Sequence, residues 1–156
     1  NALLLITKIE NKQFLDNKEI NVANCINKQI SEFADMISIK KIKLTKQFAQ
    51  QKLININPVL ADILFSNLIS NAIKHNFEDG IINIILNNNF LMIQNSGKLF
   101  KGNPNDVFNR FFKDKSSPNS LGLGLTIVKK ITTLYNMNIV YSQNNNLNEF
   151  HLFFFL

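Results

Sequence analysis

The stretch Asn67-Leu-Ile-Ser-Asn71-Ala-Ile-Lys74-His75 places two asparagines and a histidine at intervals of four residues. In a helix this spacing aligns the three side chains on one face, with the lysine beside them. Asparagine is a poor residue for the middle of a helix, so the aligned pair indicates a polar stripe that faces a ligand. Amide oxygens suit Mg²⁺, and a lysine ammonium suits a phosphate. The alternative is a solvated helix face in a chain rich in asparagine.

The sequence around this stretch predicts a helix over 58–75, because apolar residues recur there every three or four positions. Asn57-Pro58 supplies its start, with asparagine as N-cap and proline as the first helical residue. Alternation and turn residues elsewhere predict an α+β fold of two layers, an α/β sandwich in which three helices cover one face of the sheet. We expect further helices at 3–16, from about Asn24 to Ile37, at 106–113 and at 122–135, and strands at 18–22, 42–48, 53–56, 81–86, 90–94, 139–142 and 150–155.

A second candidate segment is Gly122-Leu123-Gly124-Leu125, which precedes a predicted helix. Two glycines allow backbone N–H groups to approach an anion, and the helix N-terminus adds a favourable dipole. The alternative is an ordinary helix start after a loop.

Two further segments lie between these. Ile93-Gln94-Asn95-Ser96-Gly97 ends a strand in a turn, where the Asn95 oxygen could accept a hydrogen bond from an adenine amino group; the alternative is a simple turn. Val107 to Lys113 combines three phenylalanines with Arg110 and Lys113. We expect these phenylalanines, Phe108 included, to pack in the core more readily than to stack on a base.

Composition limits the class of protein. The chain has 156 residues, of which 46% are hydrophobic, which is enough for one domain with a buried core. Its single cysteine, Cys25, fits a reducing compartment and a packed or half-buried thiol. The net charge of +6 is spread along the chain, so it predicts no nucleic-acid interface. No apolar run approaches the ~20 residues of a membrane helix.

The four segments, in this order, resemble the histidine kinase catalytic domain of the GHKL ATPase superfamily. Asn67 to His75 is similar to its N box, Asn95 to Gly97 to a reduced G1 box, Phe108 to Phe112 to its F box, and Gly122 to Leu125 to its G2 box. The resemblance covers about residues 18–156 and implies the Bergerat fold, a mixed sheet with helices on one face and a flexible ATP lid. It makes 1–17 the tail of a dimerisation helix, with Asn1-Ala2 compatible with a cloning remnant.

The resemblance also implies roles for individual residues. Asn71 is the expected Mg²⁺ ligand, and Asn95 takes the adenine-binding position. Residues 98–121 form the lid. The other expected contacts with ATP come from Asn67, Lys74, His75, Gly97, Phe108, Gly122, Leu123, Gly124 and Leu125, and Asn67, Lys74, Arg110 and Lys113 are the expected catalytic groups.

Two departures from the family pattern concern the G1 box. Asn95 stands where the family has aspartate, and its NH₂ group can oppose adenine N1 or an ordered water. Leu99 replaces a second glycine. Both favour altered nucleotide affinity, and they leave open a degenerate nucleotide-binding scaffold or a phosphatase-biased member.

A third departure concerns the reaction. Hydrolysing members of the superfamily have glutamate where Asn67 stands, and an amide cannot act as a general base, so phosphoryl transfer is favoured over hydrolysis. Neither His75 nor His151 has an acidic neighbour of the kind that accompanies the phosphoacceptor histidine.

The resemblance therefore implies a protein-histidine kinase fragment that binds ATP and Mg²⁺. Its partners would be its own dimerisation domain, which lies outside the sequence, and a response regulator receiver domain. The full-length protein would be a homodimer, whereas this fragment could be a monomer. The fragment would belong to the cytoplasmic part of a bacterial inner-membrane sensor.

Overall fold

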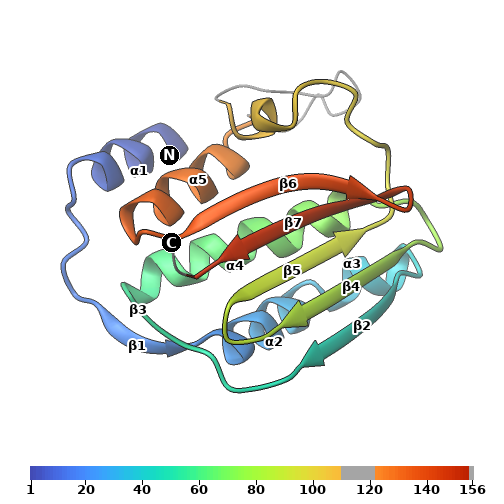
Figure 1. Ribbon diagram of the computed structural model, residues 1–156, viewed down its shortest axis with the longest axis horizontal. Helices are drawn as coiled ribbons and strands as arrows, with labels where there is room; N and C mark the ends of the chain where they lie inside the picture. The colour runs from blue at the N-terminus through green and yellow to red at the C-terminus, as the bar shows by residue number, and fades with distance from the viewer. Residues whose placement is uncertain (110–121, 155–156) are drawn as a thin grey trace.

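A mixed five-stranded sheet lies against a layer of helices in the computed structural model, which describes residues 1–109 and 122–154 (Figure 1). The predicted α+β fold with helices covering one face of the sheet is confirmed. The helices are α1 (Ala2–Glu10), α2 (Val22–Glu32), α3 (Ala34–Ile39), α4 (Pro58–Lys74) and α5 (Gly124–Leu134), with a 3₁₀ helix η1 (Pro104–Phe108). The strands are β1 (Lys18–Asn21), β2 (Lys43–Phe48), β3 (Leu53–Ile56), β4 (Ile81–Leu86), β5 (Phe90–Asn95), β6 (Asn138–Asn144) and β7 (Leu147–Phe153).

The order of strands in the large sheet is β2-β4-β5-β7-β6, and only the β2–β4 pair is parallel. β1 and β3 form a separate antiparallel pair. Alternate residues of β4 and β5 are buried, as expected for strands with one face on a core. Ile84, Ile93 and Phe150 lie opposite one another across three strands, so the inward register is continuous through the centre of the sheet.

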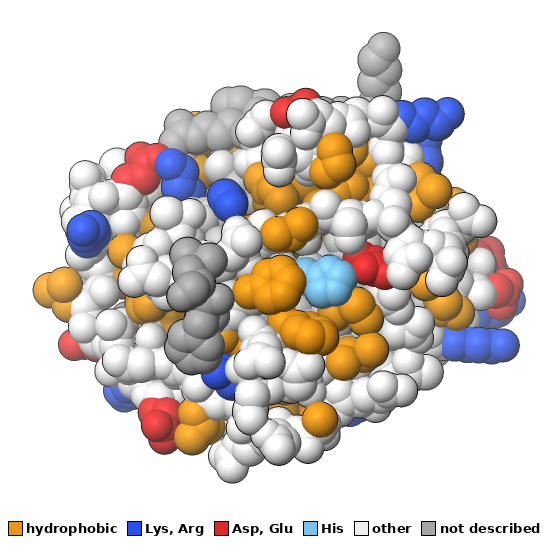
Figure 2. Space-filling model, in the orientation of Figure 1, with side chains coloured by type: hydrophobic (Ala, Val, Ile, Leu, Met, Phe, Trp, Pro, Cys, Tyr) orange, Lys and Arg blue, Asp and Glu red, His pale blue; other side chains and the backbone are white. Residues whose placement is uncertain are grey.

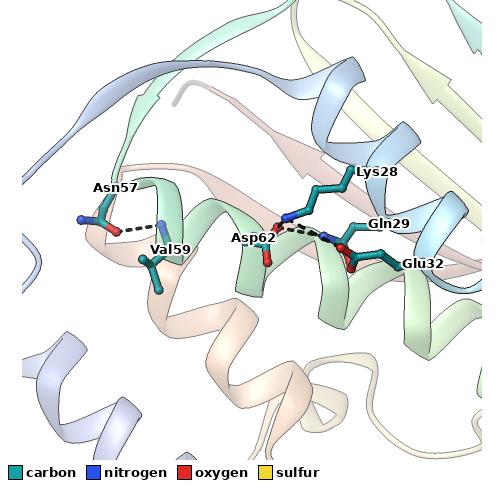
Figure 3. A network of polar contacts seen from close by, with 6 residues as sticks. All are labelled: Lys28, Gln29, Glu32, Asn57, Val59 and Asp62. Carbon is teal, nitrogen blue, oxygen red and sulfur yellow. Dashed lines mark hydrogen bonds and ion pairs between the residues drawn. The ribbon is translucent and has the colours of Figure 1, made fainter.

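Helix α4 forms the centre of the helical layer and carries the polar stretch from which the prediction began. The Asn57 side chain accepts from the backbone N–H groups of Val59 and Leu60, which confirms the predicted cap (Figure 3). Leu64 and Phe65 are fully buried, and each such side chain contributes about 1.5–3 kcal/mol through burial. These contacts fix α4 against the sheet.

Neighbouring helices hold α4 from the other side. Asp62 of α4 accepts hydrogen bonds from Lys28 and Gln29 of α2, which ties the two helices together (Figure 3). α1 packs on α5, and its Ile6 and Ile9 are buried in the common core. The position of α4 is therefore set by contacts along its whole length.

Several predicted boundaries are wrong. The helix expected at 3–16 ends at Glu10, because Lys12 adopts a left-handed backbone with φ of 52°. The helix expected from Asn24 begins at Val22, where the Asn21 side chain caps it, and it is interrupted at Phe33. Of the helix expected at 106–113, the described part is a 3₁₀ helix that begins earlier, at Pro104, and residues 110–113 lie outside the described part of the chain.

The outer face of the sheet is partly apolar. On it the rings of His151, Phe90 and Phe153 contact one another, with the His151 centroid 5.8 Å from Phe90 and 5.9 Å from Phe153, and Figure 2 shows hydrophobic side chains around a histidine on this face. This agrees with the structural role expected for His151. In the described part of the chain, no helix is long and apolar enough to cross a membrane.

Candidate active site

The polar stretch of α4 lies at the C-terminal half of the helix. Asn67 and Asn71 are half-buried on it, whereas Lys74 and His75 are exposed. The helix ends at Lys74, and His75 is its C-cap residue, so the predicted stripe is one residue longer than the helix. Among the described residues, the Asn71 side-chain amide has no hydrogen-bond partner.

Asn67 faces the start of α5. Its Nδ2 donates to the Ile63 carbonyl oxygen at 2.8 Å, which fixes the orientation of the amide. A Cβ atom added to Gly124 would lie 2.8 Å from Asn67 Oδ1, so only glycine leaves room for this approach. The two motifs that resemble the N and G2 boxes therefore meet, although Gly124 lies 57 positions after Asn67 in the sequence.

The start of α5 has the features of an anion site. Gly122 has a positive φ of 66°, a conformation that glycine adopts without strain. The N-cap residue Leu123 provides no side-chain hydrogen bond to the first N–H groups of the helix. Leu123 itself is buried and Leu125 is half-buried. Both leucines pack against the core, and their contact with a ligand stays a prediction. N–H groups at a helix N-terminus suit a negative ligand.

Asn95 is the most unusual residue of the site. It is 1% exposed, and its Nδ2 donates to the Ser96 carbonyl oxygen at 2.8 Å. Its Oδ1 is buried and has no hydrogen-bond partner. A buried oxygen without a donor costs about 1–3 kcal/mol. The oxygen is therefore a good candidate for a hydrogen bond from a ligand.

The turn after Asn95 rests on the end of α4. Gly97 has a φ of 147°, and a Cβ atom there would lie 2.2 Å from the His75 carbonyl oxygen. The contact is with backbone, which cannot move away as a side chain can. The third predicted segment thus joins the other two along the second half of α4.

Phe108 lies beside this region but is buried. Its ring packs edge-on against Phe150 at 6.2 Å, and Lys129 lies over it at 5.8 Å. Its carbonyl oxygen accepts from the Thr126 hydroxyl at 3.0 Å, which links η1 to α5. The packing role expected for Phe108 agrees with this position, and its contact with a ligand stays a prediction. Arg110 and Lys113 lie outside the described residues, as does the whole second half of the expected lid, residues 110–121.

Within residues 1–109 and 122–154, no group of three or more His, Cys, Asp or Glu side chains could hold a metal ion. The amide oxygen of Asn71, together with oxygens of a nucleotide, is the donor set that we expect for a divalent cation in this site. That donor set suits Mg²⁺, which keeps several waters and is commonly shared between the protein and a nucleotide.

Three residues next to the site were not predicted. Asn76 follows the C-cap of α4, Ser96 lies in the turn after β5, and Lys40 ends the α3 segment. Asn76 and Ser96 hydrogen-bond to each other at 2.6 Å. The sequence does not indicate their contacts, because Asn76 is one of many asparagines and Ser96 lies in the motif without a predicted role.

Comparison with known proteins agrees with this geometry. Residues 57–155 match the family of histidine kinase-, DNA gyrase B-, and HSP90-like ATPases. This match covers more than half of the chain, and the chain belongs to that family. The family predicted from the ordered motifs is confirmed.

The relatives with similar sequences are sensor proteins. The heme sensor protein HssS of Staphylococcus saprophyticus is 29% identical over 93% of this chain and 33% of its own length. HssS of Staphylococcus aureus is 32% identical over 92% of this chain and 32% of its own length. The chain therefore spans about one third of these curated relatives.

Solved structures share the fold. The histidine kinase AdeS of Acinetobacter baumannii has a TM-score of 0.79 at 21% identity, covering 97% of this chain and 74% of that one. The catalytic domain of histidine kinase ThkA has a TM-score of 0.78 at 22% identity, covering 88% and 94%. The fold is thus that of histidine kinase catalytic domains.

Proposed function

We propose that this chain is the catalytic domain of a sensor histidine kinase. It binds Mg-ATP between the second half of α4, the Asn95–Gly97 turn and the start of α5. It transfers the γ-phosphoryl group to a histidine on the dimerisation helices of the same protein, for relay to a response regulator. The observation that carries the proposal is the buried, unpaired Oδ1 of Asn95 at one end of a site whose other end is an uncapped helix N-terminus.

Each part of ATP has a counterpart in this site. The adenine amino group donates to Asn95 Oδ1, and the phosphates meet the N–H groups at Gly122 and Gly124. Asn71 is the protein ligand of Mg²⁺, which neutralises phosphate charge when it is bound. Lys74 adds positive charge on the phosphate side, and Arg110 and Lys113, which lie outside the described residues, stay expected catalytic groups.

Asn67 decides what kind of reaction is favoured. Its Nδ2 already donates to the Ile63 carbonyl oxygen, and its Oδ1 faces Gly124. An amide cannot take a proton from water, so hydrolysis has no general base at this position. A histidine nitrogen supplied from outside can attack the γ-phosphorus, the bond to the bridging oxygen of ADP breaks, and the imidazole N–H proton leaves to solvent. Catalysis then depends on positioning and charge.

The phosphoacceptor histidine must lie outside this chain. Of its two histidines, His75 caps α4 and His151 packs against two phenylalanine rings. We therefore assign the acceptor to dimerisation helices that precede α1, in a homodimeric protein of the bacterial membrane whose catalytic domain is cytoplasmic. The structure of ThkA in complex with the response regulator protein TrrA supports a receiver domain as the kind of partner.

Phosphorylation of the full-length protein tests this function. Incubation with Mg²⁺ and γ-labelled ATP should give acid-labile, base-stable label, and the isolated chain should give none. Nucleotide binding without any label in the full-length protein would contradict kinase activity. It would favour the degenerate scaffold or phosphatase-biased member to which Asn95 and Leu99 point.

A further inference from the structure

A buried pair of polar side chains lies behind the candidate adenine-binding residue. The Ser96 hydroxyl donates to Asn76 Oδ1 at 2.6 Å and accepts from the Ile81 N–H at 2.8 Å. Asn76 is 7% exposed, and its Nδ2 donates to the Ile81 carbonyl oxygen at 2.9 Å. We call this pair the Asn76–Ser96 bridge. It joins Asn76, which follows the C-cap of α4, to Ser96, which follows β5. The bridge therefore connects the end of α4 to the turn that carries Asn95.

The surroundings of the bridge are shaped to hold it. A Cβ atom on Gly80 would lie 1.9 Å from Asn76 Oδ1 and 2.5 Å from Ser96 Oγ, so glycine leaves the space that the bridge fills. The Lys40 ammonium donates to the carbonyl oxygens of Ile73, Lys74 and Asn76 at 2.9, 2.9 and 3.1 Å. A cation at the negative end of a helix is favourable, and here it also fixes the backbone of Asn76.

Ser96 is also the residue that orients Asn95. Its N–H donates to the Ile81 carbonyl oxygen at 3.1 Å, and its own carbonyl oxygen accepts from Asn95 Nδ2 at 2.8 Å. With that carbonyl held in place, the Asn95 amide keeps its NH₂ group inward. Rotation of the amide would bring Oδ1 against the Ser96 oxygen, and two acceptors repel. The orientation that leaves Asn95 Oδ1 as an unpaired acceptor is thereby kept.

We propose that Asn76 and Ser96 are positioning residues for base recognition, which make the site select 6-amino over 6-oxo purine nucleotides. The inference rests on the proposed function, since it concerns the same nucleotide. An adenine amino group donates to the fixed Oδ1. The 6-oxo group of hypoxanthine places a second acceptor there, and a site with an unmatched buried acceptor rejects such a ligand. A freely rotating asparagine would accept both bases.

Calorimetric titration with Mg-ATP and Mg-ITP tests this, because the two nucleotides differ only in the amino or oxo group and its adjacent ring proton. Wild-type protein should bind ATP at least about tenfold more tightly than ITP. Ser96→Ala and Asn76→Ala should lower this ratio to about three or less. Ser96→Thr keeps the hydroxyl and should keep the ratio. An unchanged ratio in folded Ser96→Ala and Asn76→Ala would overturn the inference.

Tyr135→Phe is the matched control. It removes a hydroxyl that bonds Asn57 N and Asn17 Oδ1 at the other end of α5, so it should lower the melting temperature without changing the ratio. A second measurement uses wild-type protein alone, so it tests the inference even if the variants fail to fold. The Asn95 side-chain NH₂ should show slow solvent exchange by NMR without nucleotide, and exchange as fast as that of exposed asparagines would overturn the inference. Binding without discrimination contradicts this inference alone, whereas no binding of either nucleotide contradicts the proposed function.

Discussion

Gly124 and Asn67 are so close that a Cβ atom on the glycine would lie 2.8 Å from the asparagine Oδ1. This approach brings the start of α5 onto the polar side of α4. It makes one site from two motifs that are far apart in the sequence, and it explains why neither motif is convincing alone.

Gly124→Ala should therefore impair binding more than folding. Alanine is the better helix residue by up to about 1 kcal/mol, which offsets part of the clash, so the free energy of unfolding should change by less than about 1 kcal/mol. Mg-ATP affinity should fall at least about tenfold, because the displaced Asn67 amide and the added methyl group disturb the phosphate side. The affinity is measured by calorimetry and the stability by urea unfolding.

A double-mutant cycle with Asn67→Ala checks the geometry itself. Removing the Asn67 side chain makes room for the methyl group, so Gly124→Ala should then cost no stability and the two changes should couple by about 1 kcal/mol. Additive effects would show that the two residues do not touch.

Gly97→Ala should be much more destabilising. Its Cβ would meet the His75 backbone oxygen at 2.2 Å, and the backbone has a φ of 147° that only glycine adopts readily. We expect a loss on the order of 3 kcal/mol in the free energy of unfolding. Urea unfolding of Gly97→Ala and Gly124→Ala compares the two losses in the free energy of unfolding. Equal small losses in both variants would contradict the described turn.

Asn95→Leu should separate stability from binding. The change removes a buried, unpaired oxygen and also one hydrogen bond to Ser96, so the free energy of unfolding should stay within about 1 kcal/mol of wild type. Mg-ATP affinity should nevertheless fall at least about tenfold, because the acceptor for the base is gone. A variant that binds ATP normally would remove Asn95 from base recognition.

Cys25 should react slowly with thiol reagents. Burial, with a smaller effect of the nearby Asp62 carboxylate, raises the pKa of the thiol above its ordinary value. Less thiolate is then present at pH 8, and the alkylation rate of folded protein should rise only at higher pH than that of the urea-unfolded chain. Overlapping pH–rate profiles, measured by mass spectrometry, would contradict the half-buried position.

Local signals predicted much of the fold. The Asn57-Pro58 start of α4 is confirmed because a cap depends on adjacent residues only. The two hairpins are confirmed for the same reason, with strand ends shifted by a few residues. The break at Phe33 was missed, since the apolar spacing continues through it into α3. The parallel β2–β4 pairing was also not predicted, because it joins strands that are distant in sequence.

The candidate site was predicted as segments but not as contacts. Asn67, Asn71 and Gly124 carry a recognisable spacing, whereas the close approach of Gly97 to His75 depends on how β5 meets α4. The role of Lys40 is equally non-local, since its ammonium reaches carbonyl oxygens at the far end of α4. Site residues on one helix can be predicted from their spacing in the sequence. Contacts that depend on how separate elements pack cannot.

The most direct test of the ATP site is the Mg²⁺ dependence of ATP binding in Asn71→Ala. Alanine favours a helix, so the variant should be as stable as wild type or slightly more stable. The matched control is Asn24→Ala, which changes an exposed asparagine of α2 outside the site. Calorimetry should show that Mg²⁺ strengthens ATP binding in wild type and in the control, and that this gain is lost in Asn71→Ala. An unchanged gain in folded Asn71→Ala, or no ATP binding by the wild-type chain, would contradict the account.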